Sequence, residues 1–118
     1  MTQSEIKKRN EAIAKMLGWF KEDGQPETWF AIIDSAKYVV YSEYKDQFKE
    51  LPFHKDWNYL MKAKEFIEKE GEISRVTVKI FRKSCVISSL LHGNIGVSED
   101  DCLTSTFIAI SSYAINKQ

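Results

Sequence analysis

The sequence predicts an α+β fold in which helices pack as a sandwich against a mainly antiparallel, four-stranded sheet. Three helix-like segments alternate with two pairs of β-rich segments, in the order helix–hairpin–helix–hairpin–helix. A short polar break joins the members of each pair, which is typical of hairpins, and hairpins build antiparallel sheets. The length of 118 residues suits one domain, so we expect a single globular unit over residues 1–118.

The composition excludes several classes of protein. Lys plus Arg and Asp plus Glu number 17 each, so no net field draws the chain to nucleic acid or acidic lipid. The longest uncharged run, Cys102–Asn116, is too short to cross a bilayer and is rich in Ser and Thr. The N-terminus lacks the apolar core of a signal peptide. We therefore expect a cytoplasmic protein that does not enter membranes and keeps Cys85 and Cys102 reduced.

The first helix is predicted from Glu5 to Leu17. Ser4 is a candidate N-cap, and apolar residues recur behind it at helical intervals. Gly18 follows as a natural stop, because glycine adopts the left-handed conformation without steric cost. The basic triplet Lys7-Lys8-Arg9 lies on the polar side, where it is either a solvated face or a phosphate-binding patch.

Two β-rich runs, Thr28–Ile33 and Lys37–Tyr44, predict the first hairpin, after a turn-like stretch from Lys21 to Glu27. Neither side of the second run is cleanly polar, so both faces are expected to be partly covered. The second hairpin is predicted from the alternating residues that end at Ile80, with Cys85–Leu91 as the returning strand. The glycine-containing stretch from His92 to Gly96 is predicted to be a loop.

A central helix is predicted after Pro52, with His54 or Asp56 as its cap and Gly71 as its stop. Its apolar residues lie on a broad arc, so the helix is expected to contact the sheet and a neighbouring helix, and thereby to organise the fold. The residues of this arc are Trp57, Leu60, Ala63, Phe66 and Ile67.

The last helix is predicted from Glu99 to Asn116, with Ser98 as its cap. Its many β-branched residues leave a strand open as an alternative. Ile108 and Ile115 lie well round from the predicted core side. Either another helix of the domain covers them, or they form a surface for self-association or for a protein partner.

Residue types that carry chemistry are present, but their spacing predicts no catalytic, cofactor or metal site. His54 and Asp56 lie close enough for a catalytic pair, although helix capping also explains both. Cys85, His92 and Cys102, with His54, lack the tight pairs of a zinc site. The stretch Gly93–Gly96 lacks the lysine of a phosphate loop.

Aromatic residues are numerous enough to form a stacking surface for single-stranded nucleic acid, although core packing also accounts for most of them. The residues concerned are Trp29, Tyr38, Tyr41, Tyr44, Trp57 and Tyr59.

Three features together resemble a known family: Leu17-Gly18-Trp19, the run Phe53-His54-Lys55-Asp56-Trp57-Asn58-Tyr59-Leu60-Met61, and the uncharged closing helix. In these the chain resembles the phage ABA sandwich domain, a family of small phage and prophage proteins. The hairpin region from Trp29 to Glu50 is longer than that resemblance implies. The resemblance implies a helix–sheet–helix sandwich and a mobile-element origin. It implies no established activity, so no functional residue follows from it.

The sequence thus favours a non-enzymatic phage or prophage accessory protein that acts through protein–protein interaction or self-association. The alternative is a small nucleic-acid-binding module that uses Lys7, Lys8, Arg9 and exposed aromatic residues. A third hypothesis, an enzyme that uses His54 and Asp56, has less support from the sequence.

Overall fold

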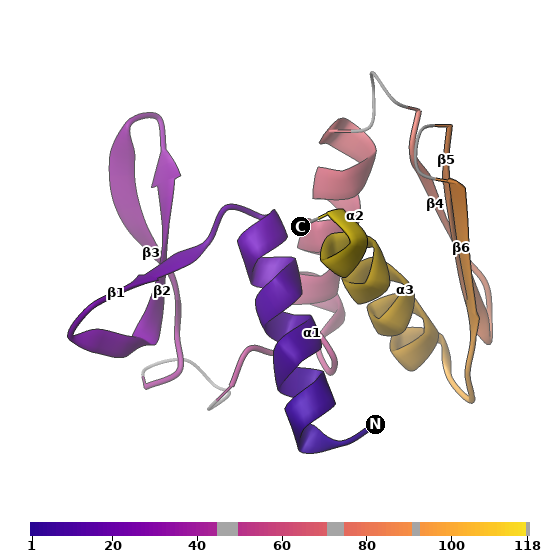
Figure 1. The fold of residues 1–118 in the computed structure, drawn as a ribbon, viewed down its shortest axis with the longest axis horizontal. Helices are drawn as coiled ribbons and strands as arrows, with labels where there is room; N and C mark the ends of the chain where they lie inside the picture. Colours follow the sequence, from indigo (N-terminus) through magenta and orange to yellow (C-terminus); the bar gives the residue numbers. More distant parts are fainter. Residues whose placement is uncertain (45–49, 71–74, 91–92, 118) are drawn as a thin grey trace.

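A computed structural model describes residues 1–44, 50–70, 75–90 and 93–117. Over these residues the fold has three helices and two separate three-stranded antiparallel sheets (Figure 1). The α+β class is confirmed. The prediction of a single four-stranded sheet is wrong, because each predicted hairpin carries one further strand and the two sheets do not join.

Helix α1 spans Gln3–Met16 and begins two residues earlier than predicted. Its N-cap is Thr2, whose hydroxyl accepts a hydrogen bond of 3.1 Å from the backbone N–H of Glu5. Ser4 therefore lies inside the helix instead of capping it. Gly18 has φ +84°, which confirms that glycine allows the chain to leave the helix in the left-handed conformation.

The first sheet has the order β1-β2-β3, with β1 at Phe20–Glu22, β2 at Gln25–Ile33 and β3 at Ala36–Ser42. The turn predicted over Lys21–Glu27 is wrong. The turn there consists of Asp23 and Gly24 alone, and Glu22 already pairs with Gln25. A three-residue strand is too short to show an alternating pattern, so the sequence carries no clear signal for β1.

The second half of the chain contains α2 (Trp57–Glu70), β4 (Thr77–Ile80), β5 (Ser84–Ser89), β6 (Gly93–Ser98) and α3 (Cys102–Lys117). The sheet order is β4-β5-β6. The loop that the sequence predicted from His92 to Gly96 is wrong over residues 93–96. These residues belong to β6 and pair with β5. His92, Leu91 and the predicted helix stop Gly71 lie outside the described residues.

The closing segment is a helix, which excludes the strand alternative, but it begins later than predicted. Ser98 ends β6, and the cap of α3 is Asp101. Its carboxylate accepts hydrogen bonds from the backbone N–H of Thr104 at 2.8 Å and from the Thr104 hydroxyl at 2.9 Å. These bonds lower the pKa of the Asp101 carboxyl, because they stabilise its charged form.

The elements form layers in the order first sheet, α1, the pair α2 and α3, and second sheet (Figure 1). Helix α3 contacts α1, α2, β5 and β6. The absence of charge between Cys102 and Asn116 is what allows burial on several sides. The organising element is therefore α3, and the prediction that α2 has this role is wrong.

Helix α2 contacts β4 and α3, which confirms that it touches a sheet and a helix. Its buried residues are Leu60, Ala63 and Ile67. Trp57 was expected on the core side and is instead 38% exposed. Asp56 is the N-cap of α2, so Trp57 occupies the first helical position. Trp57 therefore lies at the end of the helix, outside the group of buried residues.

Candidate functional sites

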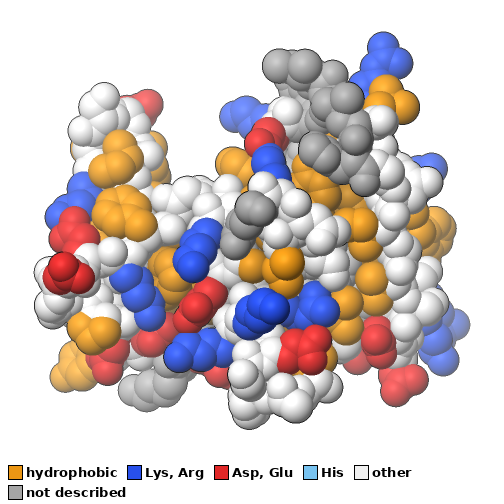
Figure 2. Space-filling model, in the orientation of Figure 1, with side chains coloured by type: hydrophobic (Ala, Val, Ile, Leu, Met, Phe, Trp, Pro, Cys, Tyr) orange, Lys and Arg blue, Asp and Glu red, His pale blue; other side chains and the backbone are white. Residues whose placement is uncertain are grey.

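The outer end of the β2–β3 hairpin is apolar on both faces. We call residues 32–39 the hairpin tip. Ile32, Ile33, Tyr38 and Val39 expose 59%, 50%, 53% and 61% of their surface. Both faces of β3 were expected to be partly covered, and over the hairpin tip this is wrong. In Figure 2 the first sheet rises as a separate column with hydrophobic side chains on it, and a notch divides it from the rest of the molecule.

The register of the hairpin shows why its tip is exposed. Ala31 pairs with Tyr38, and Ile33 pairs with Ala36, so these residues share one face. The same face carries Trp29 and Ala31 into the core, where both are buried. Ile33 and Tyr38 continue this face past the end of the core. The hairpin is thus longer than the surface that supports it.

The opposite face of the first sheet contains a small cluster of its own. Phe20 pairs with Phe30, and Phe30 pairs with Val39. Lys37 is the one charged residue of β3. Its ammonium lies 2.7 Å from the Glu22 carboxylate and 5.0 Å from the centroid of the Phe30 ring. The charge at this edge of the sheet is therefore already paired within the molecule.

His54 and Asp56 do not act as a pair. Asp56 caps α2 by accepting a hydrogen bond of 2.8 Å from the backbone N–H of Asn58, which confirms its predicted role. His54 was the other predicted cap, and that is wrong. Its Nδ1 lies 2.9 Å from the side-chain amide of Asn10, and its Nε2 lies 3.4 Å from Glu50.

The Asn10 side chain determines the state of His54. Its Oδ1 accepts a hydrogen bond of 3.1 Å from the backbone N–H of Phe53, so its –NH₂ group must point to His54. His54 Nδ1 is then an acceptor, and the proton lies on Nε2, toward Glu50. Burial lowers the pKa of His54, which outweighs the opposite effect of Glu50. This neutral imidazole joins α1 to the segment before α2.

A surface hollow of about 300 Å³ lies beside this cluster and shares Asn10 and Glu50 with it. Its other lining residues are Gln3, Lys7, Glu11, Glu43 and Leu51. Carboxylates exceed cations in this lining, which does not suit a phosphate. Over the described residues, no group of three or more His, Cys, Asp or Glu side chains could hold a metal ion.

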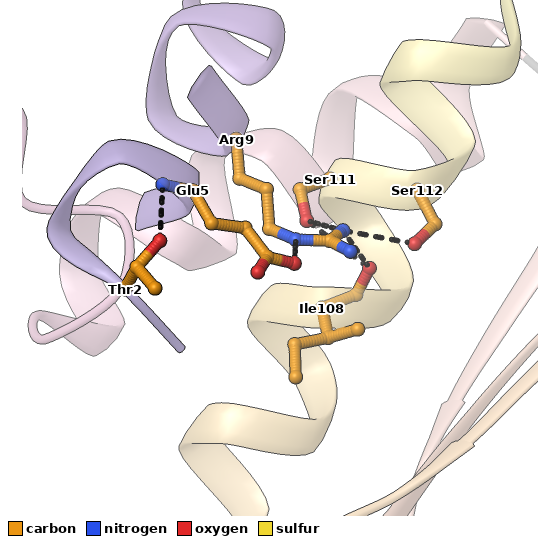
Figure 3. A network of polar contacts seen from close by, with 6 residues as sticks. All are labelled: Thr2, Glu5, Arg9, Ile108, Ser111 and Ser112. Atoms are coloured by element: carbon orange, nitrogen blue, oxygen red, sulfur yellow. Dashed lines mark hydrogen bonds and ion pairs between the residues drawn. The ribbon is translucent and has the colours of Figure 1, made fainter. Parts of the chain in front are cut away.

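The basic triplet does not form one patch. Arg9 turns toward α3 and donates hydrogen bonds to the hydroxyls of Ser111 at 2.9 Å and Ser112 at 3.0 Å (Figure 3). Its Nε also donates to the Glu5 carboxylate at 3.1 Å. Lys7 and Lys8 remain exposed. Arg9 therefore joins two helices, and its charge is paired.

Ile108 and Ile115 are partly buried and pack against the core. Helix α1 lies along α3, and Arg9 of α1 donates a longer hydrogen bond of 3.5 Å to the Ile108 carbonyl. Of the two expectations for these residues, the structure thus supports the first, in which another helix of the same domain covers them.

The remaining residues singled out in the sequence are mostly structural. Cys85 is buried in β5, where burial raises the pKa of its thiol, and Cys102 is partly buried at the start of α3. Trp29 and Tyr41 belong to the core, and Tyr59 packs edge-on against Tyr41 at 5.5 Å. The exposed aromatic residues of the predicted stacking surface lie apart, on β3, on the turn after it and at the start of α2: Tyr38, Tyr44 and Trp57.

Comparison with family models, curated proteins and solved structures finds no match to this chain. Among the described residues, none of the helices has the length and apolar character needed to cross a membrane. Sequence reasoning missed the hairpin tip as a surface. The available signal was the apolar character of both sides of β3, which was interpreted as two covered faces.

Proposed function

We propose that this protein acts by binding another protein chain through the hairpin tip and catalyses no reaction. The observation that carries the proposal is the exposure of Ile32, Ile33, Tyr38 and Val39 on both faces of one projecting hairpin. Apolar side chains that gather on one exposed element mark interaction surfaces in soluble domains. Here they lie beside a strand edge that has no neighbouring strand in the part of the chain that the structure describes, and this edge offers backbone partners as well.

The alternative, a nucleic-acid-binding module, has less support. Such a module combines unpaired cations with stacking aromatic side chains. Arg9 is paired with Glu5 and α3, and the cation of β3, Lys37, is paired with Glu22. The exposed Tyr38 thus lies next to a neutralised charge instead of a free one.

The phage or prophage origin that the family resemblance implies stays a prediction, as does a cytoplasmic location. The genes that neighbour this one would test the origin directly. Capsid, tail or integrase genes on either side would support an accessory protein of a mobile element, and housekeeping operons would contradict it.

A photoreactive benzoylphenylalanine placed at Tyr38 tests the proposed function. Phe81 offers a matched control position, because it is also aromatic and is 51% exposed, against 53% for Tyr38. The full chain would be irradiated in cells that naturally make it. We expect discrete cross-linked products from position 38 and none of the same size from position 81. Equal product patterns from the two positions, or no products from either, would contradict the proposal.

A further inference from the structure

We propose that the partner is a second copy of this chain, and that the β3 strands of the two copies pair antiparallel about Tyr38 into one six-stranded sheet. This inference rests on the proposed function and names its partner. It uses a strand edge and an apolar surface that are both already present in the single chain.

The free edge of the first sheet is β3. The sheet order β1-β2-β3 leaves one side of β3 without a neighbouring strand among the described residues. Residues 36–39 are all exposed. In an antiparallel strand, alternate residues turn their N–H and C=O groups to opposite sides, so every second residue of this stretch offers both groups to a new strand.

The turn determines which residues these are. Ile33 and Ala36 flank a two-residue loop, and in such hairpins the flanking pair is the one that exchanges backbone hydrogen bonds. Ala36 and Tyr38 therefore direct their backbone groups toward β2. Lys37 and Val39 direct theirs toward the free edge.

A two-fold pairing that uses Lys37 and Val39 is centred on Tyr38. Lys37 then lies opposite Val39 of the other copy, and Tyr38 lies opposite its own counterpart. The two Tyr38 residues would form a pair that exchanges no backbone hydrogen bonds with each other. In such a pair the Cα atoms are about 4.5 Å apart and the side chains come closest. A register centred on Val39 would instead place Lys37 opposite Tyr41, which is 1% exposed. The exposed stretch thus selects the register about Tyr38.

Charge and apolar character both suit a second copy. The ammonium of Lys37 already has Glu22 at 2.7 Å, so this lysine does not repel a second copy as an edge lysine otherwise does. The chain has a formal net charge of +0, so two copies carry no net repulsion. Because the pairing places Tyr38 opposite its own counterpart, it gives this exposed side chain an aromatic neighbour. On the other face it places Val39 beside the aliphatic stem of Lys37 of the other copy.

The contact is small. It involves about five residues on each side, well below the roughly 800 Å² per partner of a standard interface. We therefore expect a reversible dimer with a dissociation constant on the order of 10 µM or weaker. Its sedimentation coefficient should rise with protein concentration across that range.

Disulfide trapping tests the register. In a Tyr38→Cys variant the two thiols face each other across the two-fold axis, at a separation that suits a cross-strand disulfide. The matched control is Phe81→Cys, which is equally exposed but lies at the turn between β4 and β5. The wild-type protein, with Cys85 buried and Cys102 partly buried, gives the background. Because pairing raises the local thiol concentration, we expect Tyr38→Cys to form the dimer about tenfold faster than Phe81→Cys.

A charge reversal gives an independent measurement. Tyr38→Glu and Tyr38→Lys should each sediment as monomers, because like charges would face each other directly. An equimolar mixture of the two should associate again. Phe81→Glu should behave as the wild type does. Circular dichroism spectra that match the wild type would show that the exposed substitutions leave the fold intact.

The outcomes separate this inference from the proposed function. Equal trapping rates for Tyr38→Cys and Phe81→Cys, or a wild-type monomer at all concentrations up to the millimolar range, would overturn the second copy as partner. If the benzoylphenylalanine at Tyr38 then captured a different protein in cells, the proposed function would stand without the dimer. If it captured nothing, both would fail.

Discussion

The side-chain amide of Asn10 donates a hydrogen bond of 2.9 Å to Nδ1 of His54, across 44 residues of sequence. The bond requires Nδ1 to lack a proton. It therefore makes the contact between α1 and the segment before α2 dependent on the charge of one imidazole.

The first prediction concerns pH. Burial lowers the pKa of His54 in the folded protein below the value of 6.5 that an unperturbed imidazole has. Between these two pKa values the unfolded chain binds more protons, so the contribution of His54 to stability is complete above pH 6.5 and is lost as the pH falls through the folded pKa. Chemical denaturation from pH 8 to pH 5 should show a falling free energy of unfolding. His54→Gln, which does not titrate, should show a weaker dependence; an identical slope would contradict the assignment.

Asn10 should be more important for stability than its polar character suggests. It is buried, and Asn10→Ala would leave the backbone N–H of Phe53 and Nδ1 of His54 without their partner. We expect a loss of about 1–3 kcal/mol in the free energy of unfolding, measured with urea. Lys8→Ala, an exposed change on the same helix, should cost less than about 0.5 kcal/mol. Equal effects of the two changes would show that the cluster adds nothing.

Arg9 should not be replaceable by lysine. Arg9→Lys keeps the positive charge, but one ammonium cannot reproduce the planar contacts to Glu5, Ser111 and Ser112. We expect a loss of about 1–2 kcal/mol, since the side chain is largely buried and its partners include hydroxyls of a buried helix. Lys7→Arg on the exposed face is the control, and its melting temperature should match that of the wild type.

The turn of the hairpin tip should be stabilised by glycine. Asp34 and Ser35 have φ angles of +50° and +67°, a combination that favours glycine at the second position of a two-residue hairpin loop. Ser35→Gly should raise the free energy of unfolding by about 0.5–1 kcal/mol. Glycine avoids the cost of roughly 1–2 kcal/mol that other residues incur in the left-handed conformation, and its greater freedom in the unfolded chain offsets part of this gain. Gly24→Ala is the opposite control, because Gly24 has φ +84° in the other turn of this sheet, and it should lower the melting temperature. A loss of stability in Ser35→Gly would contradict this account.

Local patterns in the sequence predicted the order of the main elements. The helical periodicity of α1 and α2, and the alternation that ends at Ile80, are local signals that the structure confirms. Strand β6 has no such signal, because two of its six residues are glycine and its first four residues lie in the stretch that was predicted to be a loop. It becomes a strand by pairing with β5, where Cys85 lies opposite Val97 and Ile87 lies opposite Ile95.

The candidate sites were less predictable than the fold. The sequence placed His54 and Asp56 together because they are two residues apart, yet the Nδ1 atom of His54 contacts Asn10 on α1, 44 residues away. The exposure of the hairpin tip depends on where the core ends beneath β2, since Trp29 and Ala31 are buried and Ile33 is not. A pattern within one strand does not contain that information.

The joint between Arg9 and α3 has a consequence for folding kinetics. Arg9 and Ser111 are 102 residues apart, so closing this contact orders nearly the whole chain, whereas each hairpin closes over a few residues. Contacts of such high sequence separation are costly to close, so we expect the Arg9 contacts to form late, after the transition state of folding. Loss of the joint should therefore mainly speed unfolding and leave the folding rate almost unchanged. The Arg9 contacts would then determine how long a folded molecule persists.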